Sequence, residues 1–139
     1  MAPFFGRFEH TVDEKGRLTL PAKFRVDFEH GGYLTQGLDG CLSLWTPDEF
    51  EAQTAAMQAR ASQSQADRNL VRLWASSSTD LTVDRQGRIS VPARLRAFAG
   101  LADDVLVLGA IDRVELWDPG RWDEKVGSAE QRLAAGTDL

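Results

Sequence analysis

Asp13-Glu-Lys-Gly16-Arg17-Leu-Thr-Leu-Pro-Ala-Lys-Phe-Arg25 returns 71 residues later as Asp84-Arg-Gln-Gly87-Arg88-Ile-Ser-Val-Pro-Ala-Arg-Leu-Arg96. Six positions are identical, and most of the others exchange similar residues. Further matches keep the same order at an offset of 72: Leu42-Ser-Leu-Trp45-Thr-Pro47 lies over Val114-Glu-Leu-Trp117-Asp-Pro119, and residues 33–37 lie over 105–109. An ordered internal repeat indicates that one structural unit has been duplicated.

Each copy of the repeat has the pattern of a β-hairpin. Polar and apolar residues alternate in 7–12 and again in 17–20, with the turn expected at 14–16. The second copy predicts strands at 81–83 and 88–91 around a turn at 85–87. Two more short strands are expected in each copy, ending at Trp45 and Trp117.

Prolines mark the expected helix starts. Pro21 and Pro92 cannot continue a central strand but suit the first turn of a helix. Thr46-Pro47-Asp-Glu49 has the arrangement of a capping box, and Asp118-Pro119 predicts a second start of this kind. Residues 47–74 favour helix with a break near 62–67, and their alanine-rich surface suits contact with a neighbouring subunit.

Size and composition limit the possible classes of protein. Half of 139 residues makes a marginal domain, so we expect the two halves to share a core or to oligomerise. The chain is 42% hydrophobic and 27% charged, without an apolar run near the ~20 residues of a membrane span and without a secretory signal. We therefore expect a cytoplasmic protein without membrane contact. The lone Cys41 is expected to be a packing residue.

Charge is distributed unevenly along the chain. Segment 7–25 has five basic and three acidic residues, and segment 84–96 has four basic and one acidic. Together they carry +5 in a chain of net charge −5, so the remainder carries −10. The two basic segments coincide with the two copies of the repeat, which favours binding of a polyanion at those places.

The Asp-x-x-Gly-Arg pattern indicates a rigid turn. Asp13 and Asp84 can accept hydrogen bonds from the N–H groups of their turns, while Gly16 and Gly87 can adopt a positive φ. Such a turn fixes the start and direction of the next side chain, Arg17 or Arg88.

Arginine at that position suits DNA recognition. Its planar fork can bond a guanine edge or a phosphate at two points, and a two-stranded ribbon is narrow enough for the major groove. Lys15, Arg85 and Gln86 on the turns can add phosphate or base contacts. In the alternative interpretation, each Asp and Arg only staple their own hairpin.

The order and spacing of these motifs, over nearly the whole chain, resemble the MraZ family. The resemblance implies an α+β, β-rich fold in which duplicated AbrB/SpoVT-like hairpin modules form a small double-ψ or swapped-hairpin barrel with flanking helices. It implies domain 1 at 4–51, a helical connector at 52–74, domain 2 at 75–122 and a C-terminal helix and tail at 123–139. The family's DNA-contacting arginines fall on Arg17 and Arg88, and its structural aspartates on Asp13 and Asp84.

The resemblance also implies a function. Members regulate transcription of the division and cell-wall gene cluster, bind tandem direct repeats in promoter DNA as ring-shaped homo-oligomers, and often repress their own operon. We accordingly expect a nucleoid-associated protein without a cofactor, metal or small-molecule substrate. Arg85 departs from the family pattern and is expected to strengthen phosphate contact or alter sequence preference.

Two other classes of protein were weighed. An enzyme is not expected, because the sequence has no glycine-rich nucleotide loop, metal-spaced cluster or triad, and His10 and His30 are isolated. An antitoxin would usually join one such domain to a disordered inhibitory tail, whereas this sequence predicts two domains and almost no tail. The four tryptophans are interpreted as core or interface residues rather than as stacking platforms for bases.

Overall fold

The computed structural model describes residues 3–136, and it is an α+β structure rich in strands. The strands are β1 Arg7–Thr11, β2 Arg17–Thr19, β3 Gly32–Gln36, β4 Leu42–Trp45, β5 Thr79–Leu81, β6 Arg88–Ser90, β7 Asp104–Gly109 and β8 Val114–Trp117. The helices are α1 Ala22–Arg25, α2 Pro47–Ala61, α3 Gln65–Ser77, α4 Ala93–Ala99 and α5 Pro119–Ala135. None of these helices is both long and apolar enough to cross a membrane.

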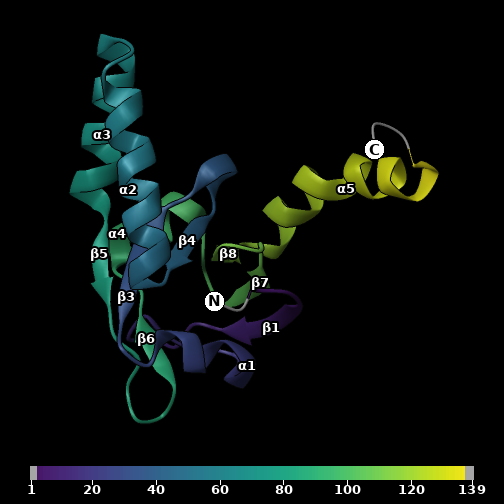
Figure 1. The fold of residues 1–139 in the computed structure, drawn as a ribbon. Helices are drawn as coiled ribbons and strands as arrows, with labels where there is room; N and C mark the ends of the chain where they lie inside the picture. Colours follow the sequence, from purple (N-terminus) through teal and green to yellow (C-terminus); the bar gives the residue numbers. More distant parts are fainter. Residues whose placement is uncertain (1–2, 137–139) are drawn as a thin grey trace.

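The strands form one antiparallel sheet of six, in the order β1-β7-β8-β4-β3-β5, and a separate ribbon of two, β2-β6. The larger sheet does not close, because β1 and β5 are its two edges, and a barrel is therefore not formed. The double-ψ detail stays a prediction. Figure 1 shows the helical hairpin of α2 and α3 rising from one end of the sheet and α5 projecting from the other.

Strands of the two halves pair with each other in both sheets. Strand β1 pairs with β7, β4 with β8, β3 with β5, and β2 with β6. The prediction of a complete hairpin within each copy was therefore wrong: only a single bridge, between Val12 and Leu18, joins the strands beside the first turn. The turns do form, but the strands beyond them separate and pair across the repeat. In this way two units too small to bury a core alone share one.

The shared core lies between the ribbon and the large sheet. Leu18 of β2 and Ile89 of β6 lie opposite each other and are buried, together with Phe24, Leu95 and Val107. Phe4 packs edge-on against Phe24, with 5.5 Å between ring centroids. Leu18 and Ile89 pack on this core from one face of the ribbon, so the opposite face of the ribbon lies outside the core.

The predicted helix starts are confirmed. The Thr46 side chain caps α2 by accepting from the N–H of Glu49, and Asp118 caps α5 by accepting from the N–H of Arg121 at 3.0 Å. The break expected near 62–67 lies between α2 and α3, where Ser64 caps the second helix. The expected domain boundaries at 51/52 and 122/123 fall inside α2 and α5, and the division into modules stays a proposal. Residues 137–139 of the expected tail lie outside the described residues.

One part of the repeat alignment needs correction. Tyr33 lies opposite Trp45, whereas Leu106 lies opposite Trp117, so Leu106 rather than Val105 is the structural counterpart of Tyr33. A slip of one residue exchanges the two faces of a strand, which is why the difference matters. Val105 accordingly faces the main core, while Leu106 faces a smaller cluster with Cys41 and Trp117 on the other side of the sheet.

Candidate nucleic-acid interface

The first turn is closed by the carboxylate of Asp13. Its Oδ1 accepts from the backbone N–H groups of Lys15 and Arg17, both at 2.9 Å. The Asp13 carbonyl accepts from the N–H of Gly16, and the Asp13 N–H donates to the carbonyl of Arg17. Gly16 has a φ of +78°, a conformation that residues with a Cβ rarely adopt. The turn predicted from the sequence is therefore present.

The second turn repeats this geometry. Asp84 Oδ1 accepts from the N–H groups of Gln86 and Arg88 at 2.9 Å, and Gly87 also has a φ of +78°. In each turn the arginine's backbone N–H, assisted by its guanidinium, lowers the pKa of the aspartate. Both carboxylates are therefore charged at neutral pH and hold their arginines in place.

Each arginine also forms an ion pair with its aspartate. Arg17 Nε lies 3.0 Å from Asp13 Oδ2, and Arg88 Nε lies 2.9 Å from Asp84 Oδ2. The ion pair within each turn, which was the alternative interpretation of the sequence, is thus present, but it uses only the Nε nitrogen of each guanidinium. Within residues 3–136 the terminal Nη atoms of both arginines have no hydrogen-bond partner, and the side chains are 31% and 26% exposed. Stapling and ligand binding are therefore compatible.

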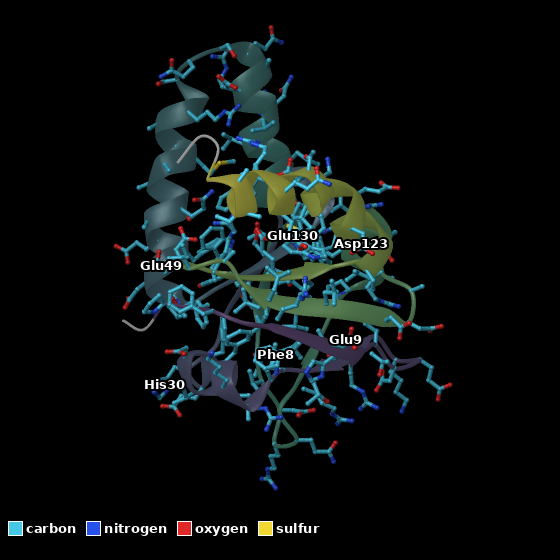
Figure 2. The ribbon with its side chains drawn as sticks, turned by 90° about the vertical axis from the view of Figure 1, so that its right-hand side faces the viewer. Phe8, Glu9, His30, Glu49, Asp123 and Glu130 are labelled. Atoms are coloured by element: carbon cyan, nitrogen blue, oxygen red, sulfur yellow. The ribbon has the colours of Figure 1, made fainter. Side chains whose placement is uncertain are left out.

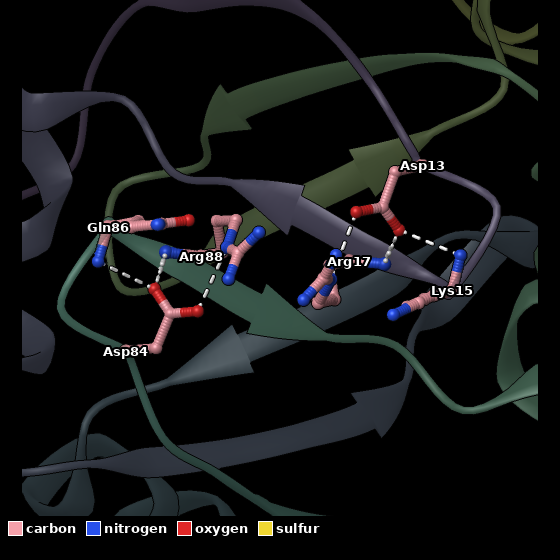
Figure 3. A network of polar contacts seen from close by, with 6 residues as sticks. All are labelled: Asp13, Lys15, Arg17, Asp84, Gln86 and Arg88. Carbon is pink, nitrogen blue, oxygen red and sulfur yellow. Dashed lines mark hydrogen bonds and ion pairs between the residues drawn. The ribbon is translucent and has the colours of Figure 1, made fainter.

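The ribbon places both arginines on one outer face. Arg17 lies opposite Ser90 and Arg88 lies opposite Thr19, while Leu18 and Ile89 point into the core. Arg17 and Arg88 are thus diagonal neighbours, which lie ~7–8 Å apart in an antiparallel pair. We call this surface, with Arg17, Thr19, Arg88 and Ser90, the ribbon face (Figure 3).

The remaining predicted residues lie at the two ends of the ribbon face. Because the strands are antiparallel, Lys15 lies beyond one end and Gln86 beyond the other (Figure 3). Arg85 precedes Gln86 in the same turn. All three residues are exposed. The structure therefore brings residues from both copies of the repeat together on one elongated surface.

Two structural arginines were not assigned a role from the sequence. Arg25 Nε donates to the carbonyl of Leu20 at 2.9 Å, and Arg96 Nε donates to that of Val91 at 3.0 Å. A Cβ on Gly87 would collide with the Arg25 side chain, and a Cβ on Gly16 would lie 3.1 Å from Arg96 Nη2. Each arginine therefore braces the turn of the opposite copy. The signal was their identity at the same place in both copies of the repeat.

Backbone hydrogen bonds tie the same turns to the opposite strands. The N–H of Leu20 donates to the carbonyl of Gly87 at 2.9 Å, and the N–H of Val91 donates to that of Gly16 at 2.8 Å. Each turn is fixed by its own aspartate and by the other copy. The arginines therefore start from a rigid backbone.

Other candidate groups lie away from the ribbon face. His10 is half-buried, and burial followed by the charge of Arg25 lowers its pKa, whereas His30 is exposed beside Glu29 (Figure 2). Cys41 is buried, which raises the pKa of its thiol to about 12. Within residues 3–136 no group of three or more His, Cys, Asp or Glu side chains could hold a metal ion.

The tryptophans are packing residues, as predicted. Trp45 and Trp117 are buried. The half-buried Trp74 stacks on Phe50, and the half-buried Trp122 packs edge-on against Trp117. None of the four belongs to the ribbon.

The duplicated site is matched by a family comparison. The family model of the MraZ protein, whose description includes the words "antitoxin-like", matches residues 4–73 and again residues 75–137. This chain belongs to the MraZ family. Two matches in tandem agree with the internal repeat of this MraZ-family chain.

Curated relatives of this MraZ-family chain are similar over most of their length. A protein of Frankia alni is 42% identical over 131 residues, which cover 94% of this chain and 92% of the relative. A protein of Nocardioides sp. is 39% identical over 131 residues, which cover 94% of this chain and 91% of the relative. A protein of Corynebacterium urealyticum is 39% identical over 135 residues, which cover 97% of this chain and 94% of the relative. Each of the three is named transcriptional regulator MraZ.

Proposed function

We propose that this chain is a DNA-binding transcriptional regulator that contacts its promoter through the ribbon face. The observation that carries the proposal is the position of Arg17 and Arg88 as diagonal neighbours on one outer surface, each with free Nη atoms. The names of its relatives as transcriptional regulators support the same function.

The chemistry of recognition follows from the staple. Because Nε of each arginine is bound to its aspartate, one nitrogen of the guanidinium is held in place, and the two Nη atoms would remain for a base edge or a phosphate. A two-point contact to guanine gives ~1–3 kcal/mol of discrimination against another base. Since an antiparallel ribbon fits the major groove, Arg17 and Arg88 would read neighbouring base pairs.

Affinity requires phosphate contacts as well. Lys15 and Arg85 extend the ribbon face at its two ends, where they would meet the backbone on either side of the groove. Each phosphate that is neutralised releases counterions, so binding should weaken steeply with salt. The acidic remainder of the chain would discourage DNA contact elsewhere.

Finer aspects of the function rest on the family resemblance. We propose that the chain regulates the division and cell-wall gene cluster and represses its own operon. It would bind tandem direct repeats in the promoter as a ring-shaped homo-oligomer. One ribbon offers only a few cationic contacts, so several ribbons on adjacent boxes would gain affinity through a raised effective concentration. We propose no catalytic activity and no cofactor.

The test is fluorescence anisotropy with DNA from upstream of the chain's own gene. Arg17→Ala and Arg88→Ala are expected to lose specific binding, while Arg68→Ala, on an exposed face of α3 away from the ribbon, binds like the wild type. Because Arg→Ala also removes the ion pair with the aspartate, the circular dichroism spectrum and melting temperature of each variant are compared with those of the wild type, so that a loss of folding is not taken for a loss of contact. Wild-type binding by both ribbon variants would show that the arginines are only staples.

A further inference from the structure

The repeat provides one helical contact in its first copy that is missing from its second. Helix α2 follows β4 and helix α5 follows β8, with Pro47 and Pro119 at equivalent positions. Along α2 packs α3, whose Trp74 stacks on Phe50 with ring centroids 5.5 Å apart. Among residues 3–136 no helix packs along α5 in this way, and α5 projects from the body (Figure 1).

Helix α5 nevertheless has an apolar stripe. Trp122, the counterpart of Phe50, packs on Trp117 at the base of the helix with 5.4 Å between centroids. Val126, Ala129 and Leu133 continue the stripe at helical spacing, and Leu133 is 66% exposed. Asp123 and Glu130 lie beside it on the exposed helix (Figure 2). The stripe is thus anchored in the molecule at one end and uncovered at the other.

An apolar groove lies beside the α2–α3 hairpin, on the face of the sheet that also carries Trp117. It has a volume of about 570 Å³ between the α2–α3 hairpin and the sheet, and its apolar lining includes Leu38, Met57, Leu70, Leu73, Trp74 and Phe98. Leu70 and Leu73 of α3 are 45% and 58% exposed. Spaces of ~300–1,000 Å³ hold drug-sized molecules, so the groove has room for several side chains of a helix.

We propose that the α5 stripe of one copy of this chain packs into the apolar groove of a second copy. The contact would give α5 a neighbouring helix, as α2 has in α3. Packing between chains would thus resemble the packing within the first copy of the repeat. The stripe and the groove are two different surfaces, each present once per chain, so the contact is head-to-tail. Repeated head-to-tail contacts form a closed ring when the rotation between neighbours closes and an open filament when it does not. The proposal rests on the homo-oligomer proposed above and assigns its interface.

The test is the mass of the full-length protein in solution, measured by light scattering and native mass spectrometry. Leu133→Glu places a charge in the stripe, and Leu73→Glu places one in the groove. Both residues are more than half exposed, so we expect unchanged circular dichroism and melting temperature. Gln131→Glu, on the opposite side of α5 from the stripe, is the matched control.

A head-to-tail contact predicts a specific pattern. The wild type and Gln131→Glu form assemblies larger than dimers, and each of the two leucine variants alone is monomeric. An equal mixture of the two forms heterodimers and nothing larger, because the intact stripe of Leu73→Glu meets the intact groove of Leu133→Glu. A monomeric wild type, wild-type assembly by either leucine variant, or a mixture without heterodimers would overturn the proposal.

The outcome is independent of the DNA-binding test. Loss of DNA binding in Arg17→Ala together with wild-type assembly of Leu133→Glu would leave the proposed function standing and reject only this interface. Normal DNA binding by the arginine variants together with heterodimers in the mixture would reject the proposed function of the ribbon face and leave this interface standing.

Discussion

The guanidinium of Arg25 lies against Gly87, a residue of the opposite turn, so closely that a Cβ there would collide with it. Arg25 Nε also donates to the carbonyl of Leu20, which follows the β2 strand. The ribbon is therefore locked at its ends by residues that belong to different copies of the repeat. The shape of the ribbon face depends on these small contacts.

Gly87→Ala is expected to destabilise the protein more than an ordinary surface change. The φ of +78° costs a residue with a Cβ about 1–2 kcal/mol, and displacement of Arg25 adds the loss of its bond to Leu20. Urea denaturation measures the free energy of unfolding. Gly127→Ala is the control: it lies in α5 with no atom near its Cβ position, and it should be neutral or stabilising by up to about 1 kcal/mol. Equal stability of the two variants would contradict the role of Gly87.

Acid should weaken the turns. Hydrogen bonds from the arginine N–H groups and guanidiniums lower the pKa of Asp13 and Asp84 in the folded protein. A lowered folded pKa stabilises the protein fully above the unfolded pKa of ~3.9, and this contribution is lost as the pH falls through the folded value. Asp13→Asn/Asp84→Asn should therefore melt below the wild type at neutral pH, and the difference should shrink below about pH 4. A difference in melting temperature that stays constant down to pH 2 would rule this out.

The sequence predicted what depends on local chemistry. The turns at Asp13 and Asp84 and the caps at Thr46 and Asp118 follow from side chains within a few residues of each other. The candidate site could also be predicted as a set of residues, because Arg17 and Arg88 occupy equivalent places in the internal repeat.

Pairing between distant segments could not be predicted in the same way. The alternation in residues 7–12 shows that one face of β1 is buried, but not that its partner is β7 instead of β2. Likewise, the sequence of residues 105–109 can be aligned with the first copy of the repeat in two registers. Only the pairing of Leu106 with Trp117 in the structure decides between them. Geometry across the repeat is what makes Arg17 and Arg88 neighbours.

The two halves should not fold separately. Strand β1 has its only large-sheet partner in β7, and the ribbon needs one strand from each half. A chain of about half this length also buries only ~60% of its unfolded surface. Residues 1–77 and 78–139, expressed apart, should each give disordered circular dichroism spectra and gain strand signal on mixing. A cooperatively melting first half would show instead that the modules are independent domains.

Arg17→Lys separates base recognition from charge. Lysine keeps the positive charge but lacks the planar fork, so loss of one two-point base contact should lower affinity for the promoter by the equivalent of ~1–3 kcal/mol. Its salt dependence should stay close to that of the wild type. Lys15→Ala and Arg85→Ala should instead reduce the slope of log affinity against log salt by about one each and keep the preference for the promoter. Anisotropy titrations at several salt concentrations, on the promoter and on a scrambled duplex, measure both quantities. If Arg17→Lys weakened binding to the two duplexes equally, Arg17 would be a phosphate contact, and specificity would have to come from another part of the ribbon face.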